Sequence, residues 1–248
     1  MDLTIIIPAY NEEKRLPPTL TRVVDQMAAC FKGTYEILVV DDGSEDGTGK
    51  AIEAFIGIYP NIRLVRQPQN KGRGVAVRQG VGMAQGNMIL EMDADGSVAV
   101  EAISRFADYM IQHPDIDMLI GSRNIEGARI PIRQPFIRRV LGYVFFTMAM
   151  FLFGWWDFRD RVNGFKMFRK RVAADIFAHQ YETGFLAEAE IVYIAERRGW
   201  KYELLPVEWT DSRDSRIHPL RESWRSFWGM FEIVKRGRRG MYTKKTSP

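Results

Sequence analysis

Asp93 and Asp95 stand two positions apart directly after the apolar run 88–92, and they are the first candidates for chemistry. In an extended chain, residues i and i+2 project to the same side, so the two carboxylates lie close together and repel one another. A cation between them removes this repulsion, and hard oxygen ligands select Mg²⁺ or Mn²⁺. Such an ion can also bind a diphosphate and neutralise its charge as it leaves. A capped turn with two solvated acids has the same pattern, so the pair alone does not distinguish a metal site from such a turn.

Short apolar runs alternate with segments of helical spacing as far as about residue 122. Strands are predicted at 3–7, 36–40, 62–65, 88–92 and 118–122. Helices are predicted between them, at 20–31, at 52–59, after Gly74 and at 103–110. This alternation predicts an α/β fold in which a mostly parallel sheet carries helices on both faces.

Polar residues follow four of these strands, at the edge where ligands bind in such sheets. They are Tyr10 to Glu12, Asp41 and Asp42, Asp93 to Asp95, and Gly121 to Arg123. Loops after parallel strands are commonly polar, but three of these four carry carboxylates, which predicts a site at this edge. The run Lys71-Gly72-Arg73-Gly74 looks like a phosphate cradle, but it lacks the spacing of a P-loop and is a weak signal.

The second half of the chain has a different pattern. Residues 124–134 show no periodicity, which predicts a mobile loop. The 17 residues Val140–Trp156 are uncharged and follow Arg138 and Arg139, but a membrane span needs about 20. They predict an interfacial helix, with a buried core helix as the alternative. Beyond them we expect a short segment at 163–168, a helix around 188–198 and a strand at 202–207.

The C-terminal tail is basic. Residues 212–248 hold ten Lys or Arg against three Asp or Glu, a net charge of +7 in a chain whose total is +4. Six apolar residues of the tail share one helical face: Leu220, Trp224, Phe227, Trp228, Phe231 and Val234. Tryptophans flanked by cations favour membrane headgroups, which predicts a peripheral protein on the cytoplasmic leaflet. A core-facing helix and a self-associating face, and so a homo-oligomer, are the alternatives. We therefore expect a domain over 1–210 and a membrane-associating tail over 211–248.

Composition excludes several classes of protein. The chain has 248 residues, of which 46% are hydrophobic and 27% charged, so bulk disorder is excluded. The single cysteine, Cys30, forms no internal disulfide, and three scattered histidines exclude a Cys/His zinc cluster. The body outside the tail is nearly neutral, which argues against nucleic-acid binding. Met1 and Asp2 lead directly into the first strand, so no N-terminal signal peptide is expected.

Seven groups of residues form an ordered set of motifs across residues 8–216. They are Pro8-Ala9-Tyr10-Asn11-Glu12-Glu13, Val40-Asp41-Asp42-Gly43-Ser44, Asn70-Lys71-Gly72, Asp93-Ala94-Asp95-Gly96, Gly121-Ser122-Arg123, Arg159-Asp160 with Gly164-Phe165-Lys166, and Val207-Glu208-Trp209 with Ser215-Arg216. With them the chain resembles the inverting glycosyltransferases of family two, on the GT-A fold. Within that family the likeness is to the polyprenyl-phosphate group, and most of all to the dolichyl-phosphate β-glucosyltransferases.

The resemblance implies a role for each matching residue. The residues implied to bind the nucleotide sugar are Pro8, Tyr10, Glu12, Asp42, Lys71, Asp93 and Asp95. Asp93 and Asp95 are also the implied ligands of Mg²⁺ or Mn²⁺. The residues implied to bind the acceptor phosphate are Arg123, Arg138 and Arg216. The residues implied in catalysis are Asp95, Arg123, Asp160 and Glu188, the last two as carboxylates of the sugar and acceptor pocket.

The implied reaction moves a hexosyl group from a nucleotide diphosphate sugar to a polyprenyl phosphate, with inversion to a β-linked product. Glucose and UDP are favoured, but Val162 and Ser97 depart from the family pattern, so GDP-mannose is an alternative donor. A hydroxyl acceptor is a further alternative, and it would need Asp160 or Glu188 as general base. Outside enzymes, the alternative is a membrane-bound module that binds nucleotide sugars without catalysis.

Overall fold

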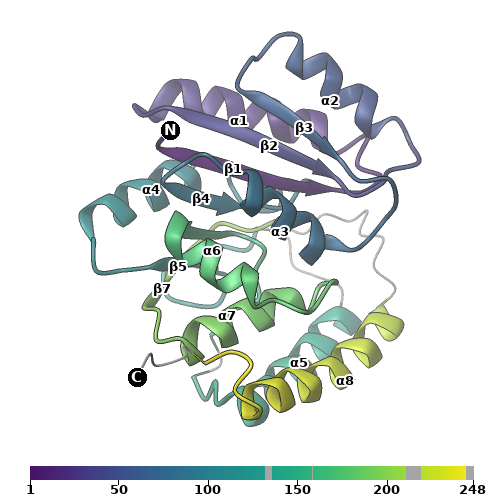
Figure 1. The fold of residues 1–248 in the computed structure, drawn as a ribbon, viewed down its shortest axis with the longest axis vertical. Helices are drawn as coiled ribbons and strands as arrows, with labels where there is room; N and C mark the ends of the chain where they lie inside the picture. The colour runs from purple at the N-terminus through teal and green to yellow at the C-terminus, as the bar shows by residue number, and fades with distance from the viewer. Residues whose placement is uncertain (132–135, 158, 211–218, 244–248) are drawn as a thin grey trace.

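The computed structural model describes residues 1–131, 136–157, 159–210 and 219–243, without the side chains of 136–139, 141 and 219–225. Its centre is a seven-stranded sheet in the order β3-β2-β1-β4-β6-β5-β7 (Figure 1). The strands are β1 (Leu3–Ala9), β2 (Tyr35–Asp41), β3 (Ile62–Arg66), β4 (Met88–Glu91), β5 (Met118–Ser122), β6 (Lys166–Arg169) and β7 (Tyr202–Pro206). Strand β6 is antiparallel to both its neighbours, and the other pairs are parallel. The predicted mostly parallel α/β sheet is confirmed.

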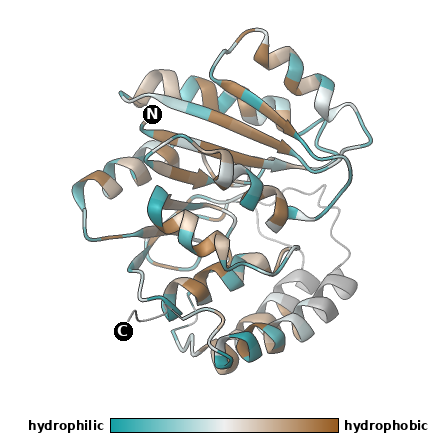
Figure 2. Cartoon of the chain, in the orientation of Figure 1, coloured by the Kyte–Doolittle hydropathy of each residue, from teal (hydrophilic) through white to brown (hydrophobic). Residues whose placement is uncertain are grey.

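Strands β1 and β2 are continuous apolar runs because both faces of the sheet are covered. Every residue of β1 is buried, and so are six of the seven residues of β2. Neighbouring side chains point to opposite faces, so Ile5 and Ile7 pack in one cluster and Ile6 in the other. Figure 2 shows these strands as largely hydrophobic ribbons beside helices in which hydrophobic and hydrophilic residues are mixed.

Helices cover both faces of the sheet. One face carries α1 (Leu16–Cys30), α2 (Thr48–Ile56) and α4 (Ala102–Gln112). The other carries α3 (Arg73–Met83), α6 (Lys170–Ala178) and α7 (Ala187–Arg197). Strands β1 to β4 end at one edge, and the chain passes from there into the loops that hold the predicted site.

Helices α5 (Phe136–Phe153) and α8 (Pro219–Arg238) lie side by side at the lower end of the molecule (Figure 1). Phe153 of α5 and Met230 and Ile233 of α8 are buried in the same cluster as α7. Other apolar side chains of the two helices are exposed: Val140, Tyr143, Val144, Phe151, Trp228 and Phe231. Across the residues that the structure describes, no helix is both long enough and apolar enough to cross a membrane.

Two elements go beyond the sequence pattern. Helix α6 is not predicted, although Val172, Ala173, Ile176 and Phe177 are buried at helical spacing within its nine residues. The antiparallel direction of β6 follows from its pairing with β4 and β5, which lie far away in the sequence. The predicted mobile loop and the predicted tail lie partly outside the described residues, at 132–134, 211–218 and 244–248.

Candidate active site

Asp93 and Asp95 lie in the turn that follows β4, at the carboxyl edge of the sheet. The side chain of Asp93 is 43% exposed and that of Asp95 is 25% exposed, so a ligand can reach both carboxylates. Asp95 Oδ1 accepts a hydrogen bond from the backbone N–H of Ser97 at 3.0 Å, and Gly96 between them has a φ of +65°. This turn keeps the two carboxylates on one short stretch of chain, as their spacing predicts.

The two carboxylates offer hard oxygen donors to a divalent cation. Burial raises the pKa of Asp93, the Arg73 cation opposes this, and the negative charge of Asp95 adds to it. A cation between the two groups would relieve that repulsion. Among the described residues, no group of three or more His, Cys, Asp or Glu side chains is arranged to hold a metal. Mg²⁺ commonly takes one or two carboxylates and completes its shell with phosphate oxygens and water, so Asp93 and Asp95 fit such an ion.

Arg73, the first residue of α3, holds Asp93 in place. Its Nε and Nη2 lie 2.9 and 2.8 Å from Asp93 Oδ1, and its Nη1 pairs with Glu188. Gly164 lies against the same group, since a Cβ there would stand 2.5 Å from both Arg73 Nη2 and Asp93 Oδ2. The absence of a side chain at position 164 therefore allows the loop before β6 to approach Asp93.

A buried ionic cluster lies behind Arg73. Glu188, in the first turn of α7, pairs with both Arg73 and Lys166 of β6, and Glu188 and Lys166 are almost wholly buried. Lys166 Nζ also donates to the carbonyl oxygen of Asn163 at 2.5 Å. Burial opposes ionisation of Glu188, but the two cations outweigh it and hold its pKa below the usual value. Glu188 is therefore a stable anion near pH 7.

Glu91, the last residue of β4, lies next to this cluster. Its Oε1 is 3.8 Å from Lys166 Nζ and its Oε2 is 4.0 Å from Arg73 Nη1, both too far for hydrogen bonds. Burial and the neighbouring Glu188 charge raise the pKa of Glu91 to about 8. The raised pKa favours the neutral form of Glu91, while Arg73 and Lys166 pair with the Glu188 carboxylate and Arg73 also pairs with Asp93.

Asp42 shapes the loop that leads into α3. Its two carboxylate oxygens accept hydrogen bonds from the backbone N–H groups of Lys71 and Gly72, each at 2.8 Å. Gly72 has a φ of +99°, a conformation that favours glycine. Asp42 is buried, and burial is the main cause that raises its pKa. This carboxyl group therefore positions the exposed Lys71 and, two residues later, Arg73.

The residues after β1 are placed at the same edge. Pro8 is buried within β1, and Tyr10, directly after the strand, is exposed. Glu12 Oε2 accepts a hydrogen bond from Arg15 Nε at 2.7 Å, and Arg15 Nη1 lies 3.9 Å from Asp95 Oδ2. Arg15 thus connects Glu12 with the candidate metal ligand Asp95.

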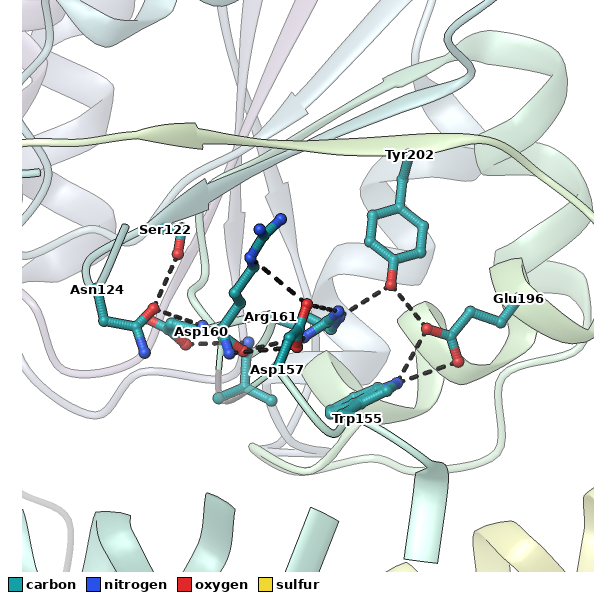
Figure 3. A network of polar contacts seen from close by, with 10 residues as sticks. Ser122, Asn124, Trp155, Asp157, Asp160, Arg161, Glu196 and Tyr202 are labelled. Carbon is teal, nitrogen blue, oxygen red and sulfur yellow. Dashed lines mark hydrogen bonds and ion pairs between the residues drawn. The ribbon is translucent and has the colours of Figure 1, made fainter. Parts of the chain in front are cut away.

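Arg123 and Asp160 form an ion pair on the side of the site formed by β5 and the loop before β6. The guanidinium of Arg123 lies 5.1 Å from the ring centre of Trp209, a cation–π contact. The backbone N–H of Asp160 donates to Asn124 Oδ1 at 2.7 Å, and Ser122 Oγ donates to the same oxygen at 3.1 Å (Figure 3). The structure therefore brings together two of the predicted catalytic residues that are 37 positions apart.

The structure does not place every predicted residue. Arg216 lies outside the described residues, and so does the side chain of Arg138. Arg73, Lys166 and Glu91 contact the predicted residues but were not among those assigned. Two of these residues lie in patterns that the sequence showed: Arg73 in the cradle-like run 71–74, and Lys166 in the Gly164-Phe165-Lys166 motif. Glu91 has no such signal, because it is one acid at the end of an apolar strand.

The family of this chain follows from comparison with known proteins. The family model described as Glycosyl transferase family 2 matches residues 4–177. The chain therefore belongs to glycosyl transferase family 2 and is a glycosyltransferase.

Curated relatives extend this likeness over most of the chain. The dolichyl-phosphate β-glucosyltransferase of Dictyostelium discoideum is 32% identical over 232 residues, which cover 89% of this chain and 70% of that protein. The dolichyl-phosphate β-glucosyltransferase of Saccharomyces cerevisiae is 30% identical, over 87% of this chain and 69% of that protein.

Solved structures share the fold at lower identity. Glucosyl-3-phosphoglycerate synthase from Mycobacterium tuberculosis, in complex with UDP, has a TM-score of 0.65 at 15% identity and covers 94% of this chain and 80% of its own. A mannosyltransferase from Pyrobaculum calidifontis, in complex with GDP-mannose and Mn²⁺, has a TM-score of 0.62 at 17% identity, over 94% of this chain and 64% of its own. The GT-A fold expected from the motifs is confirmed.

Proposed function

We propose that this enzyme transfers glucose from UDP-glucose to a polyprenyl phosphate of the dolichyl type, with inversion at the anomeric carbon. A phosphate oxygen of the acceptor attacks that carbon from the face opposite the nucleotide. The new bond joins the sugar carbon to the phosphate oxygen, the bond to the diphosphate breaks, and UDP leaves with the electron pair. The names of the curated relatives support both the sugar and the acceptor.

One observation carries the choice of a phosphate acceptor: both acids expected in the acceptor pocket are ion-paired. Glu188 is held between Arg73 and Lys166, and Asp160 by Arg123. A hydroxyl acceptor needs a general base with a pKa near neutrality, and the pKa of Glu188 is lowered instead. A phosphate monoester has a second pKa of about 6 and is already anionic, so it needs no strong base.

In this proposal, different residues bind the two anionic substrates, the nucleotide sugar and the acceptor phosphate. The nucleotide would bind to Asp42 and the loop of Lys71, which hydrogen-bond to one another, and a phosphate of the acceptor would bind to Arg123, which pairs with Asp160. A guanidinium matches two phosphate oxygens at once, and here it also offsets the repulsion between acceptor and donor. Asp93 and Asp95 would hold Mg²⁺ or Mn²⁺, which when bound neutralises charge on the diphosphate.

We propose that α5 and α8 rest on the membrane that holds the acceptor, on its cytoplasmic leaflet. Both helices expose apolar side chains, among them Phe151 and Trp228. A groove of about 420 Å³ between them is lined by Leu152, Phe231, Val234, Lys235, Arg238 and Arg239. Apolar side chains beside cations suit the headgroup region of an anionic bilayer. A domain over 1–210 and a membrane-associating tail over 211–248 remain the proposed division.

The decisive experiment offers purified protein a panel of donors and acceptors. Polyprenyl phosphate and the matching polyprenol are each incubated with Mg²⁺ and with UDP-glucose or GDP-mannose. We expect an acid-labile glucolipid from UDP-glucose and polyprenyl phosphate alone. Equal transfer to the polyprenol would refute the phosphate acceptor, and preferential use of GDP-mannose would refute the donor.

A further inference from the structure

Arg161 follows Asp160 directly, but its side chain belongs to a separate polar network (Figure 3). Its Nη1 and Nη2 lie 2.6 and 2.8 Å from the two carboxylate oxygens of Asp157, and its Nε donates to Tyr202 Oη at 2.9 Å. The Arg161 side chain is only 9% exposed. A guanidinium so far from water needs this fork-shaped pairing to offset its desolvation.

The network continues from Arg161 into three other parts of the fold. Tyr202 of β7 donates to Glu196 Oε1 of α7 at 2.7 Å. Trp155, two residues after α5, donates its indole N–H to the same carboxylate at 2.9 and 3.1 Å. The Arg161 guanidinium also lies 5.5 Å from the ring centre of Trp155. Arg161 thus links Asp157 and its own loop at residues 159–161 to β7, through Tyr202 to α7, and to Trp155 after the end of α5.

We propose that Arg161 is a positioning residue for the acceptor: it holds the chain at residues 159–161 so that Asp160 orients Arg123. This inference rests on the proposed function, in which Arg123 receives the acceptor phosphate. Asp160 is fixed on one side by Asn124 and Arg123, and its neighbour Arg161 fixes the segment on the other side. If Arg161 is removed, Asp160 keeps its partners, but the backbone that carries it loses its second anchor.

The effect should be confined to the acceptor. Asp93 is held by Arg73 from α3, and Glu188 of α7 and Lys166 of β6 complete that cluster. The contacts of Arg161 lead instead to Asp157, Tyr202 and, through Tyr202, Glu196. Loosening the chain at residues 159–161 therefore displaces the Arg123 pair more than the groups around the diphosphate.

The chain offers a matched control in Arg198. Its side chain is also 9% exposed, and its Nε and Nη2 pair with the two oxygens of Asp175 at 2.5 and 2.6 Å. Trp200 donates its indole N–H to Asp175 at 2.7 Å, as Trp155 does to Glu196. Arg198 follows the end of α7, and the 11 residues of that helix put it roughly 16 Å from the helix end that carries Glu188.

The test compares Arg161→Ala and Arg161→Lys with Arg198→Ala in full-length protein. The acceptor KM, the donor KM, the Kd for UDP by calorimetry and the Tm are measured for each. Misplacement of a binding group by about 1 Å can cost up to roughly 100-fold, so we expect Arg161→Ala to raise the acceptor KM by about tenfold or more. The Kd for UDP should change by less than about twofold. Lysine should restore part of the loss, because it keeps the charge but makes fewer hydrogen bonds.

Arg198→Ala should lower the Tm to a similar degree and leave the acceptor KM unchanged. Tyr202→Phe, which removes one hydroxyl from the network, should also raise the acceptor KM, but by less than Arg161→Ala. It is the variant that tests the inference if Arg161→Ala fails to fold. The inference is overturned if Arg161→Ala and Arg198→Ala lower the Tm by similar amounts and neither variant changes the acceptor KM. An equal rise in the donor KM would also overturn it.

Arg123→Ala separates this inference from the proposed function. If Arg123→Ala raises the acceptor KM and the Arg161 variants do not, the phosphate site stands and the positioning role of Arg161 is refuted. If Arg123→Ala itself leaves the acceptor KM unchanged, the assignment of the pair to the acceptor is wrong, and the inference fails with it.

Discussion

The charged groups that surround Asp93 lie on the sheet and on the first turns of two helices, whereas Arg123 and Asp160, on the proposed acceptor side, lie on loops. Arg73 begins α3, Glu188 stands in the first turn of α7, and Lys166 lies on β6. Arg123 follows β5, and Asp160 precedes β6 by six positions. Groups on regular elements are held by the hydrogen bonds and the packing of the whole fold, while loop groups depend on a few specific contacts.

The two sides also balance their charges differently. Arg73 pairs with both Asp93 and Glu188, and Lys166 pairs with Glu188; Glu188 and Lys166 are almost wholly buried, while Asp93 stays 43% exposed. Among the described residues, Arg123 pairs with the carboxylate of Asp160 and lies beside the ring of Trp209. The groups around Asp93 are thus supported by regular elements of the fold, and the pair on the proposed acceptor side is set by its loops.

The largest effect is expected for Asp95→Asn on the nucleotide side. This change removes charge from a candidate metal ligand, whose contribution of several kcal/mol corresponds to at least about a 1,000-fold loss of kcat. Wild-type activity should also vanish in EDTA and return with Mg²⁺ or Mn²⁺. The control is Asp115→Asn, an exposed aspartate paired with Lys201 at 3.7 Å, which should keep full activity. Full wild-type activity in excess chelator would refute the role of Asp93 and Asp95 as metal ligands.

The second effect combines stability and activity. Glu188→Gln leaves Arg73 and Lys166 without their shared anion, and breaking a buried ion pair costs about 3–5 kcal/mol. At about 2–4 °C of Tm per kcal/mol, calorimetry should show a Tm lower by roughly 6–20 °C. Because Arg73 is then free to move from Asp93, kcat should fall by about 100-fold or less at a temperature where the variant is folded.

Glu190→Gln, on the same helix, is the matched control for Glu188. Glu190 is equally buried, but it accepts hydrogen bonds from Tyr242 and from the backbone N–H groups of Tyr181 and Glu182. Its loss should lower the Tm and spare kcat. If the two variants lose kcat alike, the cluster around Glu188 has no special link to the site.

The third effect breaks the acceptor side. Arg123→Ala should raise the acceptor KM by about 10–100-fold, because a hydrogen bond to a charged group contributes about 1.5–3 kcal/mol. Binding of UDP, measured by calorimetry, should persist. Lysine at position 123 should rescue only partly, since it cannot present a planar fork to two oxygens. Arg105→Ala, which removes another arginine stacked on a ring, should change neither value. Loss of UDP binding with acceptor use intact would show that Arg123 belongs to the nucleotide side.

The smallest effect concerns the surface that brings the acceptor side to its lipid. Trp228 and Phe231 of α8 are 56% and 42% exposed, and serine at both positions removes apolar area that would enter the headgroup region. Flotation with vesicles that contain anionic lipid should fall severalfold, and transfer to long-chain acceptors should fall more than transfer to short ones. Wild-type binding should weaken at high salt, because each basic residue contributes about 1 kcal/mol near such a surface.

Ile111→Ser is the control for this surface, since Ile111 is 64% exposed on α4, which covers the other face of the sheet. That variant should float like the wild type. Unchanged flotation and unchanged acceptor preference in the double serine variant would refute α8 as the membrane contact.

Much of the nucleotide side could be predicted because its signals are local. Strands β1 to β5 are short apolar runs, and the carboxylates that end them fall at one edge whenever such strands are parallel. Asp93 and Asp95 are neighbours by spacing alone. The acceptor side has weaker local signals: α6 and the direction of β6 were not predicted, and residues 157–161 carry no periodic pattern.

The sequence by itself determined the fold class, the edge of the sheet that carries the site and the pair of carboxylates suited to a cation, because each is signalled by the types and spacing of residues close in the chain. Only the tertiary structure decided which charges neutralise one another. Arg73 meets Glu188 across 115 positions, and Arg123 meets Asp160 across 37. A charged residue in a sequence can serve as base, ligand or structural ion pair, and burial together with the nearest opposite charge, both set by packing, selects among these roles.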